Sequence, residues 1–479
     1  MNKHLCVSVA LAVLSLTAAH ATSFDQARAL MLERSWSLKM SQAELSQKRY
    51  QVKQAQALNG PKVVLNSQYI EGSKEVNLAL NNPVAPLGPV IGQTIGSALG
   101  SNPNVGPVLG QALGQQAGAL LSQNELHLRY KDDLSGPRVT LEATWPLYTG
   151  GAISAKQAAT RAAVDQAQAD LEYSQDALEV QLVQKYFGVQ LARSIQALRQ
   201  DVFTQQQRDL TRAERFEKAG MIAKIERMAA QVNRDQGERE LLQSRADTQV
   251  AERELMNLLQ EVNIGELKTP LFVVHDIKSS QYWQTIALSA NPMVKSIDAR
   301  RNQADQAVKA AKSQYHPHVY AYGQYNAVRH YLTIPEPDWI AGIGVKFTLW
   351  DNRDRSAQVG AARAQVLKAQ AAQASVRDEV KKGVDIAWLR TQQALEQFDL
   401  TESSVALAQE NLRLREKAFA NGLNTVDDVN DARNKLVGAQ VARRLAAYRF
   451  VLSYAMLHAA SGQMNQLLGA MDRADVVKL

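Results

Sequence analysis

The chain repeats itself over a long period, and this duplication constrains the fold more than any other feature. A set of landmarks in the first part recurs 256 residues later: Lys39, Val52, Ala55, Pro61 and Gln68-Tyr69 match Lys295, Val308, Ala311, Pro317 and Gln324-Tyr325. A second set recurs after only 202 residues: Leu147-Tyr148 and Gly220-Met221 match Leu349-Trp350 and Gly422-Leu423. The difference of 54 residues indicates an insertion in the first half, between Tyr69 and Trp145. A period this long indicates a duplicated unit and not a short-repeat solenoid.

Within each half, the hydrophobic period changes from helical to alternating. Ser23-x-x-Gln26 is a capping box that starts a helix, and Gly60-Pro61 ends it. Apolar and polar residues then alternate in two segments of each half, which predicts half-buried strands. The predicted segments are helix 24–58 with strands at about 62–70 and 138–148, and helix 292–313 with strands at about 318–326 and 339–349. These strands are close to the length that crosses an outer membrane when tilted.

After the second strand of each half, a long helical tract begins. The tracts cover about 152–218 and 357–418, and each would reach on the order of 100 Å at about 1.5 Å per residue. Glycine-containing turns at 219–221 and 421–423 end them, and shorter helices return. We therefore predict two long helical hairpins, at about 152–260 and 357–462, with coiled-coil seams between their helices.

The N-terminus has the pattern of a secretory signal peptide. A basic start is followed by an apolar run from Leu5 to Leu16 and by Ala19-His20-Ala21, so cleavage is expected after Ala21. The single cysteine, Cys6, lies inside the apolar run, so an exported chain would have no disulfide and no thiolate metal site. Outside this segment, no run of 18 apolar residues exists, which excludes a multi-pass helical membrane protein.

Motifs for chemistry are missing from the sequence. No nucleophile elbow, phosphate-binding loop, dinucleotide fingerprint or zinc-protease motif is present, so we expect no enzyme and no cofactor. His316 and His318 flank Pro317, but no acidic or cysteine partner is near them in the sequence, so no metal site is predicted. Lys and Arg are spread along the helices, which argues against nucleic-acid binding.

Two sequence motifs resemble those of a known family. The segment Trp145-Pro146-Leu147-Tyr148-Thr149-Gly150-Gly151 resembles the barrel-to-helix junction of the TolC family of outer-membrane efflux proteins. Gly422-Leu423 through Asp428-Val429-x-Asp431 resembles the periplasmic tip of that family. The ordered plan of helix, two strands and long hairpin extends the resemblance over nearly the whole exported chain. Pro146, Gly150 and Gly151 would then form the junction between barrel and tunnel.

The resemblance implies a mainly α-helical fold with a transmembrane β-barrel. Four strands per chain are too few to close a barrel, for which about eight are needed. The family solves this with a homotrimer, in which three chains build a 12-stranded barrel and a helical periplasmic tunnel. The expected divisions are signal peptide 1–21, first repeat 22–260 with an extracellular insertion at about 72–137, equatorial linker 261–282, second repeat 283–462 and equatorial tail 463–479.

The resemblance also implies a function. The chain would be the exit duct of a tripartite efflux or type I secretion system in the outer membrane of a Gram-negative bacterium. Its partners would be a periplasmic adaptor protein, an inner-membrane transporter and outer-membrane lipid. The alternative is a periplasmic coiled-coil adaptor or structural protein without a pore, although such a protein does not need four amphipathic strands.

Several residues near the second tip are candidates for a pore constriction. Asp428 and Asp431 are spaced i, i+3 and therefore lie on one side of a helix, where three chains would form two carboxylate rings that select cations. The alternative is that they are solvated residues at a helix N-terminus, where the helix dipole favours Asp. Glu226 occupies the matching place in the first hairpin. Phe419 and Asn424 stand where a relative has a Tyr–Arg latch, so that latch cannot form here in the same way.

The tip turns themselves combine glycine with apolar side chains. Gly220, Met221 and Ile222 form the first turn, and Gly422 and Leu423 form the second. In the family, such tips meet the adaptor protein. The alternative is an ordinary capped helical turn with its hydrophobic contact.

The insertion has an unusual composition. It has no Lys, Arg, Asp or Glu between Glu75 and Glu125, and Pro89-Val90-Ile91-Gly92-Gln93 recurs as Pro107-Val108-Leu109-Gly110-Gln111. Its Gly and Pro are too frequent for a regular buried helix. Three roles remain open: covering the pore mouth, contacting surface lipid, or forming a mobile loop without a role.

Overall fold

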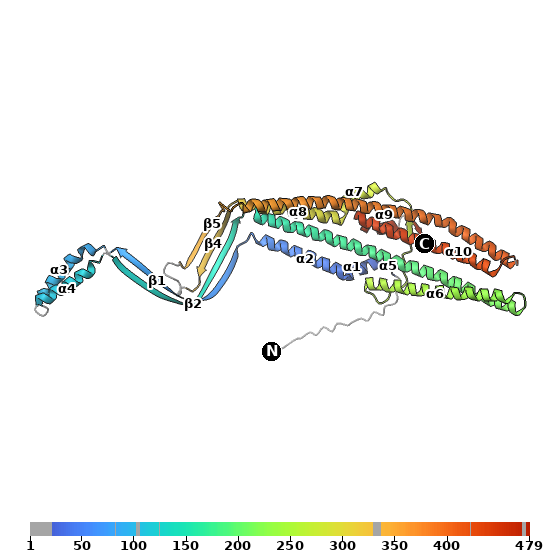
Figure 1. Ribbon diagram of the computed structural model, residues 1–479, viewed down its shortest axis with the longest axis horizontal. Helices are drawn as coiled ribbons and strands as arrows, with labels where there is room; N and C mark the ends of the chain where they lie inside the picture. Colours follow the sequence, from blue (N-terminus) through green and yellow to red (C-terminus); the bar gives the residue numbers. More distant parts are fainter. Residues whose placement is uncertain are drawn as a thin grey trace, which may run out of the picture. The chain divides into compact units, whose positions relative to one another are not determined.

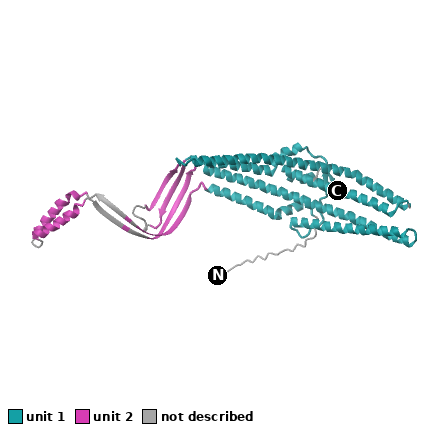
Figure 2. Ribbon diagram, viewed as in Figure 1, with its two compact units in different colours: residues 1–57, 150–316, 348–479 teal, residues 58–149, 317–347 magenta. Residues whose placement is uncertain are grey.

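The computed structural model describes residues 22–81, 83–101, 106–123, 125–328, 337–421, 423–471 and 476–479. The predicted signal peptide, residues 1–21, and Gly422 lie outside these ranges. The chain forms two compact units (Figure 2): unit 1 comprises residues 1–57, 150–316 and 348–479, and unit 2 comprises residues 58–149 and 317–347.

Unit 1 is built from helices that occur in matched pairs (Figure 1). The pairs are α1 (Phe24–Arg34) and α7 (Ser280–Ala290), α2 (Trp36–Ala57) and α8 (Pro292–Lys312), α5 (Ala152–Lys218) and α9 (Asp354–Ala420), and α6 (Lys224–Leu259) and α10 (Val426–Ser461). The helices α5 and α9 have 67 residues each, and α6 and α10 have 36 each. The helix starts differ by 256 residues in the first two pairs and by 202 in the last two, as the sequence landmarks do. No helix among the described residues is long and apolar enough to cross a membrane.

The two longest helices, α5 and α9, organise unit 1. Over one part of their length, α2 packs on α5, and α8 lies between α5 and α9. Over the other part, α6 packs on α5, and α10 contacts both α5 and α9. The outer helices of this arrangement are therefore α2 and α6 on one side and α9 on the other.

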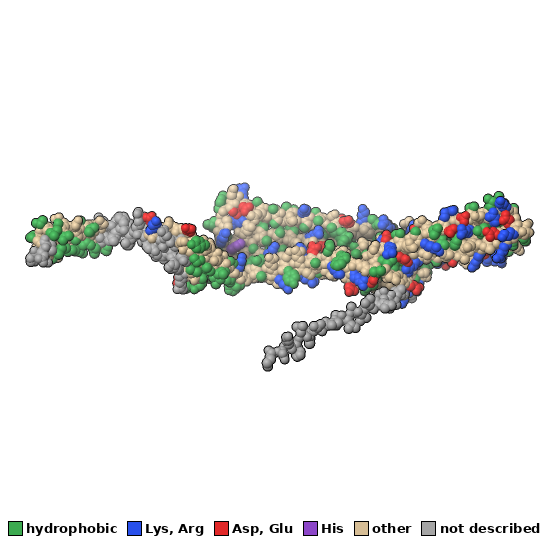
Figure 3. Space-filling model, turned by 90° about the horizontal axis from the view of Figure 1, so that it is seen from below, with side chains coloured by type: hydrophobic (Ala, Val, Ile, Leu, Met, Phe, Trp, Pro, Cys, Tyr) green, Lys and Arg blue, Asp and Glu red, His purple; other side chains and the backbone are tan. Residues whose placement is uncertain are grey.

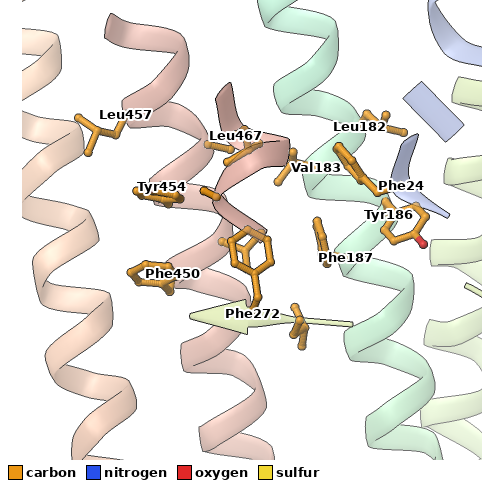
Figure 4. Close-up of a cluster of buried hydrophobic side chains, with 14 of the residues drawn as sticks. Phe24, Leu182, Val183, Tyr186, Phe187, Phe272, Phe450, Tyr454, Leu457 and Leu467 are labelled. Atoms are coloured by element: carbon orange, nitrogen blue, oxygen red, sulfur yellow. The ribbon is translucent and has the colours of Figure 1, made fainter. Parts of the chain in front are cut away.

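A buried cluster lies where α1, the linker and the hairpins meet (Figure 4). Phe24 of α1 stacks on Phe187 of α5 with ring centroids 5.6 Å apart, and Phe187 contacts Phe272 at 5.9 Å. Phe272 lies in strand β3 (Phe272–Val274), which pairs with β6 (Val476–Lys478). Because each fully buried apolar side chain contributes about 1.5–3 kcal/mol, this cluster holds the linker and the C-terminal tail on the hairpins. Short helical turns η2 (Ser313–Tyr315), η3 (Met464–Gln466) and α11 (Leu467–Met471) complete unit 1.

Unit 2 contains a four-stranded antiparallel sheet. Its order is β1-β2-β4-β5, formed by β1 (Lys62–Asn81), β2 (Glu125–Tyr148), β4 (His318–Asn326) and β5 (Trp339–Lys346). Exposed large apolar side chains recur at alternate positions along the strands, as expected for one apolar face; they include Val63, Leu65, Leu141, Trp145, Leu147, Ile343 and Val345.

The insertion contains two regular helices, although its Gly and Pro content argued against a regular buried helix. β1 continues to Asn81 and β2 begins at Glu125, so the two strands form a ribbon beyond the sheet. Between them lie the turn η1 (Ala85–Leu87) and two helices, α3 (Gly88–Gly100) and α4 (Gly106–Leu121). The expectation was wrong because tertiary packing can outweigh the low helix propensity of glycine; here glycine lets two helix backbones pack together. Two smaller corrections are that β5 ends at Lys346 and that the second long helix begins at Asp354.

Candidate functional site: the hairpin tips

The two hairpin turns lie at the same end of unit 1 (Figure 1), and side chains of both turns line a cavity. The turn between α5 and α6 and the turn between α9 and α10 border a space of about 930 Å³. Five residues predicted from the sequence line it: Met221, Ile222, Glu226, Phe419 and Asn424. The structure therefore brings candidates from both halves of the chain together at one site.

The first turn closes with backbone hydrogen bonds. The Met221 N–H donates to the Phe216 carbonyl oxygen at 2.8 Å, and the Gly220 N–H donates to the Glu217 carbonyl oxygen at 2.9 Å. Gly220 has a φ of +69°, and a Cβ placed there would meet no atom within 4 Å. Glycine is thus favoured by the backbone conformation and not by lack of space. Met221 is left 69% exposed.

The second turn closes with the same kind of backbone hydrogen bond, and the helix that follows it has a side-chain cap. The Leu423 N–H donates to the Ala418 carbonyl oxygen at 2.9 Å, and the Leu423 side chain is 77% exposed. Thr425 caps α10: its hydroxyl oxygen accepts from the Asp428 N–H at 3.2 Å, and its own N–H donates to Asp428 Oδ2 at 3.0 Å. At the matching position of α6 stands Ala223, which has no side-chain oxygen to cap the helix.

Asp428 therefore has a structural role in each chain. The Thr425 backbone N–H and hydroxyl hold the pKa of Asp428 below its usual value, and Arg415, whose Nη1 lies 3.5 Å from Asp428 Oδ1, acts in the same direction. Asp431 lies one turn further along α10 and is exposed. The position of Asp428 matches the helix N-terminus that we gave as the alternative, and neither Asp428 nor Asp431 is among the residues that line the cavity.

A buried arginine joins the two hairpins. Arg433 of α10 is only 8% exposed, and its Nη1 lies 2.8 Å from Asp209 Oδ2 of α5. Its Nη2 lies 3.6 Å from Glu416 Oε1 of α9. A second contact runs from Asn233 of α6, whose Nδ2 donates to Asp427 Oδ1 at 2.9 Å. We call the Arg433–Asp209 and Asn233–Asp427 contacts the tip ties.

Sequence reasoning missed these ties, although one signal was present. Arg433 interrupts a run of buried positions on α10 formed by Val429, Ala432 and Val437. A cation on a buried face needs a partner, because an unpaired buried charge is costly. The partner, Asp209, is 224 residues away, so only the fold identifies it.

The predicted junction residues have specific backbone roles. Pro146 lies at an irregularity in the pairing of β2 with β4, where the lost N–H is tolerated. A Cβ on Gly150 would come within 2.5 Å of the Ser313 carbonyl oxygen, so only glycine fits there. Gly151, at φ +90°, is the N-cap of α5. Among the described residues, no group of three potential metal ligands occurs, and His316 and His318 form none.

Residues 283–463, which cover the second repeat, match the family model described as "Outer membrane efflux protein". The outer membrane efflux protein BepC of Brucella suis biovar 1 is 25% identical over 297 residues, which are 60% of this chain. The aligned part spans 64% of BepC, less than two thirds of the length of that relative.

The fold is similar to that of solved outer-membrane proteins. VceC from Vibrio cholerae aligns with a TM-score of 0.66 and 16% identity, covering 92% of this chain and 96% of VceC. The open state of the Neisseria gonorrhoeae MtrE outer membrane channel aligns with a TM-score of 0.67 and 15% identity, covering 92% and 89%. At such identities, the likeness establishes the fold. The family match over the second repeat and the shared fold together confirm the resemblance of this chain to the outer-membrane efflux proteins of the TolC family.

Proposed function

We propose that three copies of the chain form an exit duct through the outer membrane. Each copy contributes four strands to a 12-stranded barrel, and the helices of unit 1 form a periplasmic tunnel. An inner-membrane transporter delivers cargo through a periplasmic adaptor that docks at the tips. The chain itself is a passive channel and not an enzyme, and the leader through Ala21 is removed on export.

The observation that carries this proposal is the sheet of unit 2. Within the described residues, β1 and β5 are edge strands, each paired on one side only. A membrane-spanning sheet cannot leave an edge unpaired in lipid, because each unsatisfied backbone group costs several kcal/mol. Since four strands are too few to close on themselves, pairing between copies supplies the missing partners. The alternating exposed apolar side chains fit the lipid-facing band of such a barrel.

The outer helices of unit 1 support the same assembly. On α9, the exposed residues Leu400, Leu407 and Leu414 are spaced by seven residues. On α6, at the opposite side, Ile225 and Val232 are exposed with the same spacing. Apolar residues at heptad spacing bury against a neighbouring helix in coiled coils. In the proposed trimer, α9 of one copy packs beside α6 of the next.

The tips serve as gate and docking site in this proposal. Asp428 and Asp431 form two acidic rings that favour cations, with Glu226, Phe419 and Asn424 beside the constriction. The tip ties hold the two hairpins together in the closed state, in place of the latch that Phe419 and Asn424 cannot make. The adaptor contacts the side chains of Met221, Ile222 and Leu423, of which Met221 and Leu423 are exposed, in the two turn segments whose sequences include Gly220 and Gly422.

Assembly can be tested with cysteine pairs, because Cys6 is the only cysteine in the sequence and lies in the predicted leader. Leu414→Cys combined with Val232→Cys should give covalent dimers and trimers with a short bismaleimide, and each single variant is the control. A doubly substituted protein that stays monomeric would contradict the trimer.

Docking can be tested with a photo-crosslinking residue at Met221 or at Leu423. Irradiation of cells should attach an adaptor protein at both positions, whereas the same residue at the exposed but remote Val262 should attach none. Intact trimers without an adaptor at either tip would overturn the tripartite mechanism and leave the channel itself standing.

A further inference from the structure

The helical hairpin of the insertion, α3 and α4, is held together by glycine. Six glycines at every fourth position are buried between the helices: Gly88, Gly92 and Gly96 of α3, and Gly110, Gly114 and Gly118 of α4. A Cβ on Gly92 would come within 2.6 Å of the Gly114 carbonyl oxygen, and one on Gly114 within 2.3 Å of the Gly92 carbonyl oxygen. The contact therefore consists of backbone, and the larger side chains lie elsewhere.

The side chains divide into two faces according to their position beside the glycines. The residues that precede these six glycines and Gly100, which continues the spacing, are apolar: Leu87, Ile91, Ile95, Leu99, Leu109, Leu113 and Ala117. Most residues that follow them are polar and uncharged: Gln93, Ser97, Ser101, Gln111 and Gln115. In two antiparallel right-handed helices, residues that precede the contact positions lie on the same side of the pair. The first set thus forms an apolar face of the hairpin, and the second set forms a mostly polar face.

The apolar face is not covered by the described part of the chain. Leu109 and Leu113 are 53% and 41% exposed, and Leu87 is 53% exposed. In Figure 3, the hairpin carries hydrophobic and uncharged polar side chains but none of the charged groups that cover the helices of unit 1. An apolar face without a partner indicates an interaction site.

The composition of the hairpin argues against lipid as the partner. Helices that lie on membranes use Lys and Arg on the polar face and aromatic anchors beside the apolar one. Between Glu75 and Glu125 there is no Lys, no Arg and no aromatic residue. The centres of protein interfaces are depleted of charge in the same way.

The placement of the hairpin favours another copy of this chain. It is carried by β1 and β2, and β1 is an edge strand over all 20 of its residues. In the proposed trimer, this edge meets the neighbouring copy, so the three hairpins are held close together. Their high effective concentration favours contact between them. We infer that the apolar faces of the three α3–α4 hairpins pack against one another above the barrel. This inference rests on the proposed trimer.

Single cysteines on the two faces test the inference. Leu113→Cys lies on the apolar face, and Gln115→Cys, two residues away on the polar face, is the matched control. Oxidation of intact cells should convert most Leu113→Cys chains to disulfide-linked dimers, since only two of three thiols can pair. The Gln115→Cys chains should stay single and react with a membrane-impermeant maleimide.

Two results would overturn the inference. In one, Leu113→Cys gives no dimers and reacts with the maleimide as fast as Gln115→Cys, although the Leu414→Cys, Val232→Cys pair still links the trimer. In the other, a bimane dye on Leu113→Cys shifts its emission only when phospholipid vesicles are added, which identifies lipid as the partner. Failure of the Leu414–Val232 link itself would contradict the proposed trimer instead.

Discussion

The two halves of unit 1 have the same backbone plan but different chemistry at the helix ends. The long helices match residue for residue in length, and so do the returning helices. The residues at equivalent positions differ: Gly151 and Arg353 at the start of the long helix, Ala223 and Thr425 at the start of the returning helix, Gln231 and Arg433 near the tip, and Met256 and His458 near its end. The two halves therefore have helices of equal length, but different side chains stabilise the helix ends in each half.

The second half holds the interactions that fix the tips. It supplies the capping box and the buried Arg433, whereas the first tip supplies the acceptor Asp209 and has no side-chain cap on α6. We therefore expect the first tip to be held in place mainly by the second.

The largest effect is expected for Arg433→Leu. The change leaves Asp209 partly buried without its cation, which should cost about 3 kcal/mol in the free energy of unfolding. Urea unfolding followed by circular dichroism measures this loss, and the channel should also conduct more in planar bilayers. Arg413→Leu, which removes an exposed ion pair within α9, is the control and should change little.

A charge exchange sharpens this test. Asp209→Arg combined with Arg433→Asp should recover part of the stability lost in each single variant, because the ion pair is rebuilt in reverse. Strictly additive losses would show that the two side chains are not coupled.

The next effect concerns acid stability. His458 is buried, its Nδ1 lies 3.0 Å from the Gln463 carbonyl oxygen, and burial lowers its pKa to about 4. The unfolded chain takes up the proton near pH 6.5 and the folded chain only near pH 4, so stability falls as the pH drops through this range. The full loss is about 3 kcal/mol.

His458→Met, which copies Met256 of the first half, should remove most of this pH dependence. Urea unfolding at pH 7 and pH 4.5 measures it, with His275→Gln as an exposed control. If the free energy of unfolding changes equally between the two pH values in His458→Met and in the unchanged chain, the role of His458 is refuted.

An effect of about 1 kcal/mol is expected at the helix starts. Thr425→Ala removes the cap of α10 and should destabilise by about that amount, while Ala223→Thr places a cap three residues before Glu226 and should stabilise α6. Hydrogen exchange of the first turns of both helices reports each change locally. If Ala223→Thr leaves exchange in α6 unaltered, the tips do not differ in capping as described.

The smallest effect is expected at the junction. Arg353 has a φ of +71°, in a region where a side chain is strained, and its counterpart Gly151 is at +90°. Arg353→Gly should stabilise the protein by about 0.5 kcal/mol, because relief of strain of about 1 kcal/mol is partly offset by the entropy of glycine. Gly151→Arg should destabilise by a similar amount. A loss of stability in Arg353→Gly would show that the Arg353 backbone carries no strain.

The sequence predicted the helices of unit 1 well, because landmarks such as Gly220 recur at a fixed offset and mark where helices end. It did not predict the extent of β1, because the residues from Glu71 to Glu75 are largely polar and show no alternation. The α3–α4 hairpin escaped prediction because its glycines form a helix contact only when both helices are present. Met221, Glu226 and Phe419 were found as candidates, but the ties of Arg433 and Asn233 join residues far apart in the chain and needed the fold.

Single-channel conductance of the purified protein in planar bilayers tests most directly whether three copies enclose one continuous pore. We predict conductance steps of one uniform size, and longer or larger openings for Arg433→Leu. A protein that is trimeric by the Leu414–Val232 cross-link but produces no conductance steps, in either form, would contradict the proposed duct.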